Sequence, residues 1–164
     1  MTLQELLATN PDGTLEAIAE QYQTSLFAVT EALPEAQRTL VAGEQFDRVW
    51  DTMTQWGEVT LISHTADAIL EFKSVLPTGT HRHGYFNLRG KNGLSGHIRA
   101  TRCQHIALIE RKFMGMDTAS VVFFNAAGDA MFKIFLGRDD HRQLLAHQVI
   151  AFRLLADELR AVAA

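Results

Sequence analysis

The sequence contains little cysteine and no long apolar run. Its 164 residues include one cysteine, Cys103, which excludes a disulfide framework and a cluster of thiolate metal ligands. No apolar stretch approaches the roughly 18 residues that a membrane span requires. The first residues also lack the basic region and cleavage site of a signal peptide. We therefore expect a soluble, cytoplasmic protein.

The sequence also lacks a strong excess of positive charge. Lys and Arg total 15 against 19 Asp and Glu, which gives a net charge of −4 and argues against a globally basic nucleic-acid binder. Charged residues at 21% and hydrophobic residues at 47% exclude disorder and low complexity. A chain of this length fits one domain, and it can bury a core without a disulfide or a structural metal.

Several common catalytic motifs are absent. The sequence has no GxSxG, GxxxxGK[ST], GxGxxG or HExxH, which removes the usual hydrolase, P-loop, Rossmann and zincin interpretations. Cys103 and His105 would share a face of a strand, where a base could activate the thiol. A lone cysteine is more often a small apolar residue, and we favour that role for Cys103.

Residues 1–57 are predicted to be helical. Thr14 is placed to cap a first helix, and residues 15–22 carry an apolar stripe at helical spacing. A second stripe over 26–33 ends at Pro34, and a third runs from Gly43 to Gly57. The first two helices and their tight turn look like a helix-turn-helix. Because the second of them contains no Lys or Arg, we favour a packing hairpin over a DNA reader.

Residues 58–137 change to a period of two, which is typical of strands. Hairpin signals occur at Asn92-Gly93 and at residues 125–129, with no helical pattern between them, so the sheet should be antiparallel. The predicted strands are 59–64, 68–73, 85–89, 94–100, 105–110, 119–124 and 130–136.

A long C-terminal helix is predicted over 140–162. Its apolar residues repeat at spacings of four and three from Leu145 to Leu159, and Asp140 with Gln143 forms a start like a capping box. The expected fold is therefore α+β, with an extended antiparallel sheet between terminal helices, in one domain over 1–164. Edge strands of such a sheet favour a homodimer.

Two groups of polar residues are candidate metal or cofactor ligands. His81 and His83 would share one face of an extended segment, and Asp139, Asp140 and His141 could complete a zinc or non-haem iron site. Residues 139–141 also serve as a helix start, and we favour that simpler role.

His64 and His97 form the second group, on separate predicted strands. An imidazole in surroundings rich in Phe and Met suits a haem iron, and Arg99 lies on the same face as His97. Tyr85 adds a phenol that could bind ferric iron. Further cations for the haem propionates are Arg89, Lys91, Arg111 and Lys112, and candidate apolar walls are Phe86, Phe113, Met114 and Met116.

Longer blocks carry a resemblance that covers nearly the whole chain. They are residues 81–90 (HRHGYFNLRG), 95–98 (SGHI), 109–120 (IERKFMGMDTAS) and 133–145 (KIFLGRDDHRQLL), together with 11–16 (PDGTLE) and Trp50-Asp51. These blocks resemble the HutX/ChuX family of intracellular haem-utilisation carrier proteins, including its enterobacterial members.

The resemblance implies a cytoplasmic homodimer that takes up imported haem, non-covalently and of b type, and passes it to a haem-processing enzyme. It implies a curved antiparallel sheet with flanking helices, similar to one half of the two-repeat haem-degrading proteins. It assigns haem contact to His64 and His97 and leaves Tyr85 as a further candidate. We expect basic residues such as Arg99 to anchor the propionates. The alternatives are a haem-degrading or tetrapyrrole-modifying enzyme and, less favoured, a DNA-binding regulator.

Overall fold

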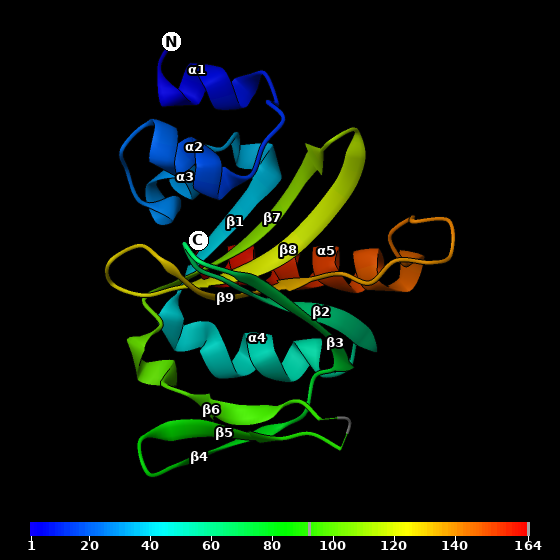
Figure 1. Cartoon of the computed structure of the whole chain (residues 1–164). Helices are drawn as coiled ribbons and strands as arrows, with labels where there is room; N and C mark the ends of the chain where they lie inside the picture. The colour runs from blue at the N-terminus through cyan, green and yellow to red at the C-terminus, as the bar shows by residue number, and fades with distance from the viewer. Residues whose placement is uncertain (92, 164) are drawn as a thin grey trace.

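The computed structural model describes residues 1–91 and 93–163, and it contains five α-helices, short 3₁₀ turns and nine strands within those ranges (Figure 1). The helices are α1 (Leu3–Ala8), α2 (Leu15–Gln21), α3 (Leu26–Ala32), α4 (Phe46–Met53) and α5 (Ala146–Ala163). The strands are β1 (Arg38–Ala42), β2 (Glu58–His64), β3 (Ile69–Val75), β4 (Gly79–Arg82), β5 (Tyr85–Arg89), β6 (Ser95–Ile98), β7 (His105–Phe113), β8 (Met116–Phe124) and β9 (Ala130–Phe135).

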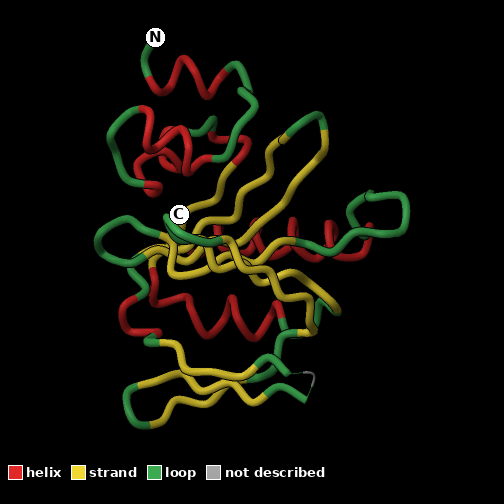
Figure 2. Tube along the Cα trace, viewed as in Figure 1, coloured by secondary structure: helices red, strands yellow, loops and turns green. Residues whose placement is uncertain are grey.

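The strands form two antiparallel sheets. The larger sheet has six strands in the order β1-β7-β8-β9-β2-β3, and the smaller has three in the order β4-β5-β6. Figure 2 shows α4 between the two groups of strands. Aromatic contacts join these layers, because the Trp50 ring of α4 lies 5.9 Å from Phe86 of the small sheet and 5.9 Å from Phe132 of the large one.

Alternation along the strands sends side chains to both faces of the large sheet. On β8, Val121 and Phe123 face the core with α4 and α5, whereas Val122 and Phe124 face the opposite side. On that opposite side, the N-terminal helices α1–α3 cover part of the sheet. Their buried residues include Leu7, Ile18, Ala19, Leu26, Val29 and Leu33. The first two predicted helices thus pack as a hairpin on the sheet, which agrees with the favoured interpretation.

All seven predicted strands are present, with boundaries shifted by a few residues. Two strands were not predicted. β1 lies inside the region expected to be helical, 1–57, and pairs with β7. β4 follows the predicted turn at Pro77 and pairs with β5. The predicted hairpin between β5 and β6 forms, but Asn92 of its turn lies outside the described residues.

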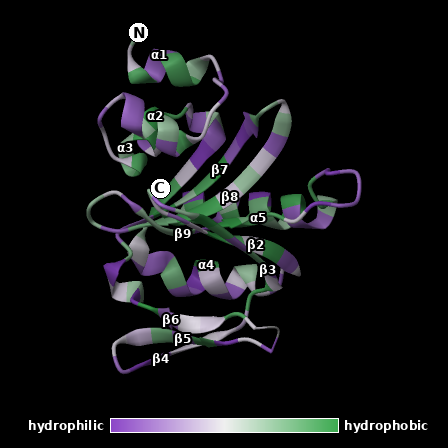
Figure 3. Cartoon of the chain, viewed as in Figure 1, coloured by the Kyte–Doolittle hydropathy of each residue, from purple (hydrophilic) through white to green (hydrophobic). Residues whose placement is uncertain are grey.

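The C-terminal helix begins at Ala146 rather than at residue 140, so the predicted helix start is wrong. The Asp139 carboxylate accepts hydrogen bonds from the backbone amides of His141 and Gln143, at 2.8 and 3.0 Å, which holds a turn in place of a helix. Arg138 and Leu144 form an isolated bridge across this loop. Figure 3 shows the loop as strongly hydrophilic.

Among the described residues, no helix is both long enough and apolar enough to cross a bilayer.

Phe123 tests the packing between the large sheet and α4. Its side chain is fully buried and its ring centroid lies 5.3 Å from that of Phe46 in α4. We expect Phe123→Ala to lower the free energy of unfolding by about 3–5 kcal/mol, because it removes apolar contacts and leaves a cavity. Urea denaturation measures this change. The matched change Leu154→Ala, on the exposed side of α5, should stay within about 0.5 kcal/mol, and equal effects of the two variants would contradict the described core.

Candidate functional site

The N-terminal helices leave part of the large sheet uncovered, and a cavity of about 350 Å³ lies there. Leu15 of α2 and Leu26 of α3 line it from the helical side. The apolar residues that line it from the sheet are Ile62, Ile69, Ile109, Phe113, Val122 and Phe135. The volume falls within the roughly 300–1,000 Å³ that is typical of small-molecule sites. We call this space the sheet cavity.

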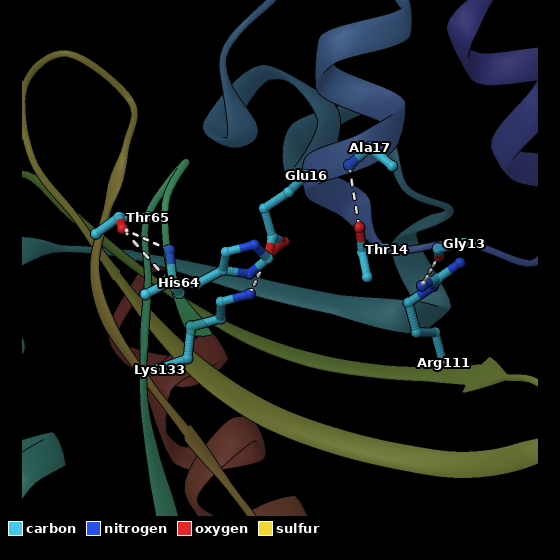
Figure 4. Close-up of polar contacts among 9 residues, drawn as sticks. Gly13, Thr14, Glu16, Ala17, His64, Thr65, Arg111 and Lys133 are labelled. Atoms are coloured by element: carbon cyan, nitrogen blue, oxygen red, sulfur yellow. Dashed lines mark hydrogen bonds and ion pairs between the residues drawn. The ribbon is translucent and has the colours of Figure 1, made fainter. Parts of the chain in front are cut away.

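Three charged or titratable side chains meet at one wall of the sheet cavity (Figure 4). His64 Nδ1 lies 2.5 Å from Glu16 Oε2, and Lys133 Nζ contacts the same carboxylate oxygen. Lys133 is buried, with 8% of its surface exposed. A buried ammonium group needs an opposite charge nearby, and Glu16 supplies it. We call these three residues the Glu16 cluster.

Two contacts fix the start of α2 and therefore the position of Glu16. The Thr14 hydroxyl caps the helix by accepting from the backbone amide of Ala17 at 3.1 Å. The Arg111 guanidinium of β7 donates to the carbonyls of Gly13 and Pro11, at 3.1 and 2.9 Å, which ties the preceding loop to the sheet.

Arg111 also lines the sheet cavity. Burial lowers its pKa, and the nearby carboxylates of Asp12 and Glu16 oppose this shift. Its Nε is buried with no hydrogen-bond partner among the described residues. Arg111 and Lys133 therefore place two cations at a largely apolar cavity whose lining also includes the carboxylates of Glu16 and Glu71.

The cavity continues along the sheet as a longer trough. A second hollow of about 470 Å³ extends towards Glu58 and Arg138, and the lining residues it shares with the sheet cavity are Ile62, Glu71, Thr118 and Phe135. The apolar end of the trough is thus beneath α2 and α3, and the polar end is beside the loop that precedes α5.

His97 lies on the outer face of the small sheet. Its Nδ1 is 2.6 Å from the Asn87 side-chain oxygen, and the Asn87 amide nitrogen donates to the carbonyls of Thr80, Arg82 and Tyr85. Those three carbonyls fix the orientation of the amide, so His97 donates from Nδ1 and keeps a lone pair on Nε2.

Tyr85 and Arg99 accompany His97 on this face. The Tyr85 and His97 ring centroids are 5.7 Å apart, and Arg99 donates to the Tyr85 hydroxyl at 2.8 Å. His97 and Arg99 are exposed, whereas Tyr85 is half-buried. The structure therefore brings together three of the four predicted haem contacts.

His64, the fourth predicted contact, lies on a different sheet from the other three, on the opposite side of α4. It faces away from α4 on the large sheet, and His97 faces away from α4 on the small sheet. Both sheets and α4 separate the two side chains (Figure 1). His64 and His97 therefore do not converge within one chain.

The zinc or non-haem iron site, which was the less favoured interpretation, is not supported. His81 contacts the Asp47 carboxylate at 2.8 Å, and His83 has a φ of +56° in the turn after β4, so the two imidazoles do not share a strand face. Across residues 1–91 and 93–163, no group of three or more His, Cys, Asp or Glu side chains is arranged to hold a metal ion.

The Cys103 thiol is buried, and it donates weakly to the carbonyl of His105. Burial raises its pKa to about 12, which keeps it protonated near neutral pH. This agrees with the role of a small apolar residue.

The other residues predicted to bind propionates or to form apolar walls lie in different parts of the structure: the core, the surface and the sheet cavity. Phe86 is 2% exposed and packs against α4, so it cannot be a wall. Phe113 does line the sheet cavity. Met114 is exposed in a turn, and Lys112 lies 3.7 Å from Asp117 at the surface.

Glu16, Lys133 and Asn87 belong to the site but were not predicted from the sequence. Lys133 had a weak signal, because it is a lone charge in the apolar strand β9. Glu16 looks like an ordinary acidic residue in the first turn of a helix, and nothing local links it to a lysine 117 positions away.

The geometry of the sheet cavity indicates the kind of ligand that it could bind. A largely apolar cavity whose wall carries an imidazole and two cations, one of them paired with Glu16, suits a flat apolar molecule that carries carboxylates. The sequence model of the haem-utilisation family ChuX/HutX matches residues 39–155, and this chain belongs to that family.

Known relatives are similar in sequence to this protein along almost its whole length. The intracellular heme transport protein HutX of Vibrio cholerae is 36% identical over 155 residues, which cover 94% of this chain and 80% of HutX. A crystal structure of an Erwinia carotovora protein is 83% identical with a TM-score of 0.96, and covers 97% of this chain and 99% of that one. The crystal structure of ChuX is 64% identical with a TM-score of 0.95, and covers 98% and 99%.

A more distant likeness concerns the fold alone. The Escherichia coli O157:H7 heme degrading enzyme ChuS is 9% identical with a TM-score of 0.78, and the match covers 94% of this chain but 47% of ChuS. The predicted fold class, an α+β curved antiparallel sheet similar to one half of such proteins, is confirmed.

Proposed function

We propose that this protein is a single carrier domain, over residues 1–164, that binds haem non-covalently in the cytoplasm and hands it to a haem-processing enzyme. The relatives named for heme transport and heme binding support this proposal. The observation that carries it is His64 at the wall of the apolar sheet cavity, beside Lys133 and Arg111.

His64 is the ligand that we propose for the haem iron. Glu16 contacts its Nδ1, and no hydrogen bond among the described residues engages its Nε2. Imidazole nitrogen is a common ligand for haem iron, and haem itself supplies the redox-active metal when bound. Phe113 and Phe135 provide aromatic walls, and the Arg111 guanidinium places a positive charge at the cavity that suits a propionate.

His97, Tyr85 and Arg99 form the second proposed haem contact. Their exposure suits a carrier, because haem that reaches an open face can be exchanged with another protein. The Asn87 side-chain oxygen accepts from His97 Nδ1, which leaves Nε2 with the lone pair that could bind iron. The positive charge of Arg99 suits a propionate. Since His64 faces the other side of the chain, haem that contacts both histidines must lie between two chains.

A second copy of the chain is the proposed partner at the edge strand β3. This strand is the last in its sheet, and it exposes Ile69, Leu70, Phe72 and Val75. A long apolar edge with unpaired backbone groups is a template for pairing with another chain. We therefore propose that two copies join their large sheets at β3.

The His64 and His97 assignments predict how variants respond in a titration with ferric haem, followed by the Soret absorbance. We expect His64→Ala to weaken haem binding about tenfold to a hundredfold, His97→Ala to weaken it less, and the double variant to lose the Soret shift. Loss of a ligand removes the bond to iron and leaves the apolar contacts and the cations that face the propionates.

His141→Ala is the matched control, because His141 is exposed in the loop before α5 and does not line the sheet cavity. It should bind haem like the wild type. A double variant that binds as well as the control would contradict the ligand assignment, and Tyr85→Phe would then be tested. A wild type that binds no better than an unrelated protein would overturn the carrier function.

The alternative function, haem degradation or tetrapyrrole modification, predicts a different result with a reductant. For a carrier, we expect the Soret band of the haem-loaded protein to persist under ascorbate when catalase is present to remove peroxide. Absorbance over time measures this. Steady loss of the band with formation of a ring-opened product, in the presence of catalase, would favour the enzyme.

The β3 interface predicts the mass of the particle in solution. We expect light scattering to give twice the mass of one chain for the wild type and one chain for Leu70→Lys/Phe72→Lys, because charges on an edge strand oppose pairing. Ile150→Lys/Leu154→Lys, on the exposed side of α5, is the matched control and should remain a dimer. A dimeric β3 variant would refute this interface.

A further inference from the structure

Two basic side chains share one carboxylate oxygen in the Glu16 cluster. Both His64 Nδ1 and Lys133 Nζ contact Glu16 Oε2, so one carboxylate serves an imidazole and an ammonium group. The three side chains come from three elements, α2, β2 and β9. All three are largely withdrawn from water, with side-chain exposures of 25%, 18% and 10% for Glu16, His64 and Lys133.

The register of the sheet places the two basic groups side by side. Lys133 of β9 pairs with Ile62 of β2, and His64 lies two residues further along β2 on the same face. Glu16 then reaches both from the helical layer above. Its own position is fixed through Thr14 and the Arg111 contacts to the preceding loop.

A carboxylate behind a histidine ligand changes what that ligand does. It holds the ring in one orientation and one tautomer, and it raises the electron density that the other nitrogen offers to a metal. A stronger and more negative donor stabilises ferric over ferrous iron. Glu16 contacts Nδ1, which leaves Nε2 as the donor.

We propose that Glu16 is a positioning residue that orients His64 and strengthens it as a ligand for ferric haem, and that Lys133 limits this effect by sharing the carboxylate. This inference rests on the proposed function and on His64 as the ligand. It assigns roles to two residues that lie at the same wall of the sheet cavity.

The two residues should act in opposite directions. Glu16→Gln keeps the size of the side chain but removes its charge, so ferric iron loses stabilisation. Lys133→Met removes the competing cation and leaves the whole carboxylate to His64, so ferric iron gains. A purely structural role for the cluster would instead weaken haem binding in both oxidation states for both variants.

The test measures ferric and ferrous haem dissociation constants and the midpoint potential of the haem-loaded protein, with thermal unfolding as a check on the fold. The variants are Glu16→Gln, Lys133→Met and His64→Ala. Glu20→Gln is the matched control, because Glu20 is an exposed acid one turn along α2 and its side chain makes no hydrogen bond or ion pair within the described residues.

We expect Glu16→Gln to weaken ferric binding about tenfold more than ferrous binding. A tenfold change in that ratio raises the midpoint potential by about 59 mV for a one-electron couple. Lys133→Met should lower the potential, and Glu20→Gln should leave it close to that of the wild type.

Each other result has a definite meaning. Shifts of the same sign in Glu16→Gln and Lys133→Met, or a Glu16→Gln shift no larger than that of Glu20→Gln, would overturn the role of Glu16 while His64→Ala still loses haem. If His64→Ala binds haem like the wild type, the ligand assignment fails, and the role of Glu16 fails with it.

Discussion

The constraint on which this structure depends is that a sheet has two faces and the chain fully covers only one of them. On the large sheet, α4 and α5 close one face over a core that includes Trp50, Phe123 and Phe152. Within residues 1–91 and 93–163, the other face is covered only by the short helices α1–α3, whose apolar residues reach β7 and β8. The uncovered strands keep side chains that alternate towards that face, and they line the sheet cavity.

The Glu16 cluster is placed where the covered and uncovered parts of this face meet. A lysine at a central strand position would be costly without an acid, and a glutamate of α2 supplies the acid. The same contact orients His64 and connects the helical layer to the sheet. The Glu16 carboxylate that compensates the buried charge of Lys133 thus also orients the His64 imidazole towards the sheet cavity.

Much of the fold follows from local patterns in the sequence. The strands were predictable because apolar and polar residues alternate along them, and Thr14 was predictable as a helix cap. β4 was missed because Gly79–Arg82 contains no apolar residue that marks a face. The start of α5 was misplaced because the Asp139 carboxylate accepts from the backbone amides of His141 and Gln143 and holds a turn, a pattern that resembles a helix cap in sequence.

The site was only partly predictable, for a different reason. Both histidines were placed correctly on strands. The alternation of a strand does not say to which sheet the strand belongs, however, and the two sheets around α4 separate His64 from His97. The pairing of Glu16 with Lys133 depends on the packing of α2 across the sheet, and residues so distant in sequence leave no local trace of it.

The central claim is that the uncovered face of the large sheet, with His64 at its wall, holds haem. A crystal structure of the haem-loaded protein tests it most directly. We expect the macrocycle in the sheet cavity beneath α2 and α3, with iron bonded to His64 Nε2 and Glu16 still against Nδ1. Haem bound without contact to His64, on the outer face of β4–β6 alone, would contradict this claim.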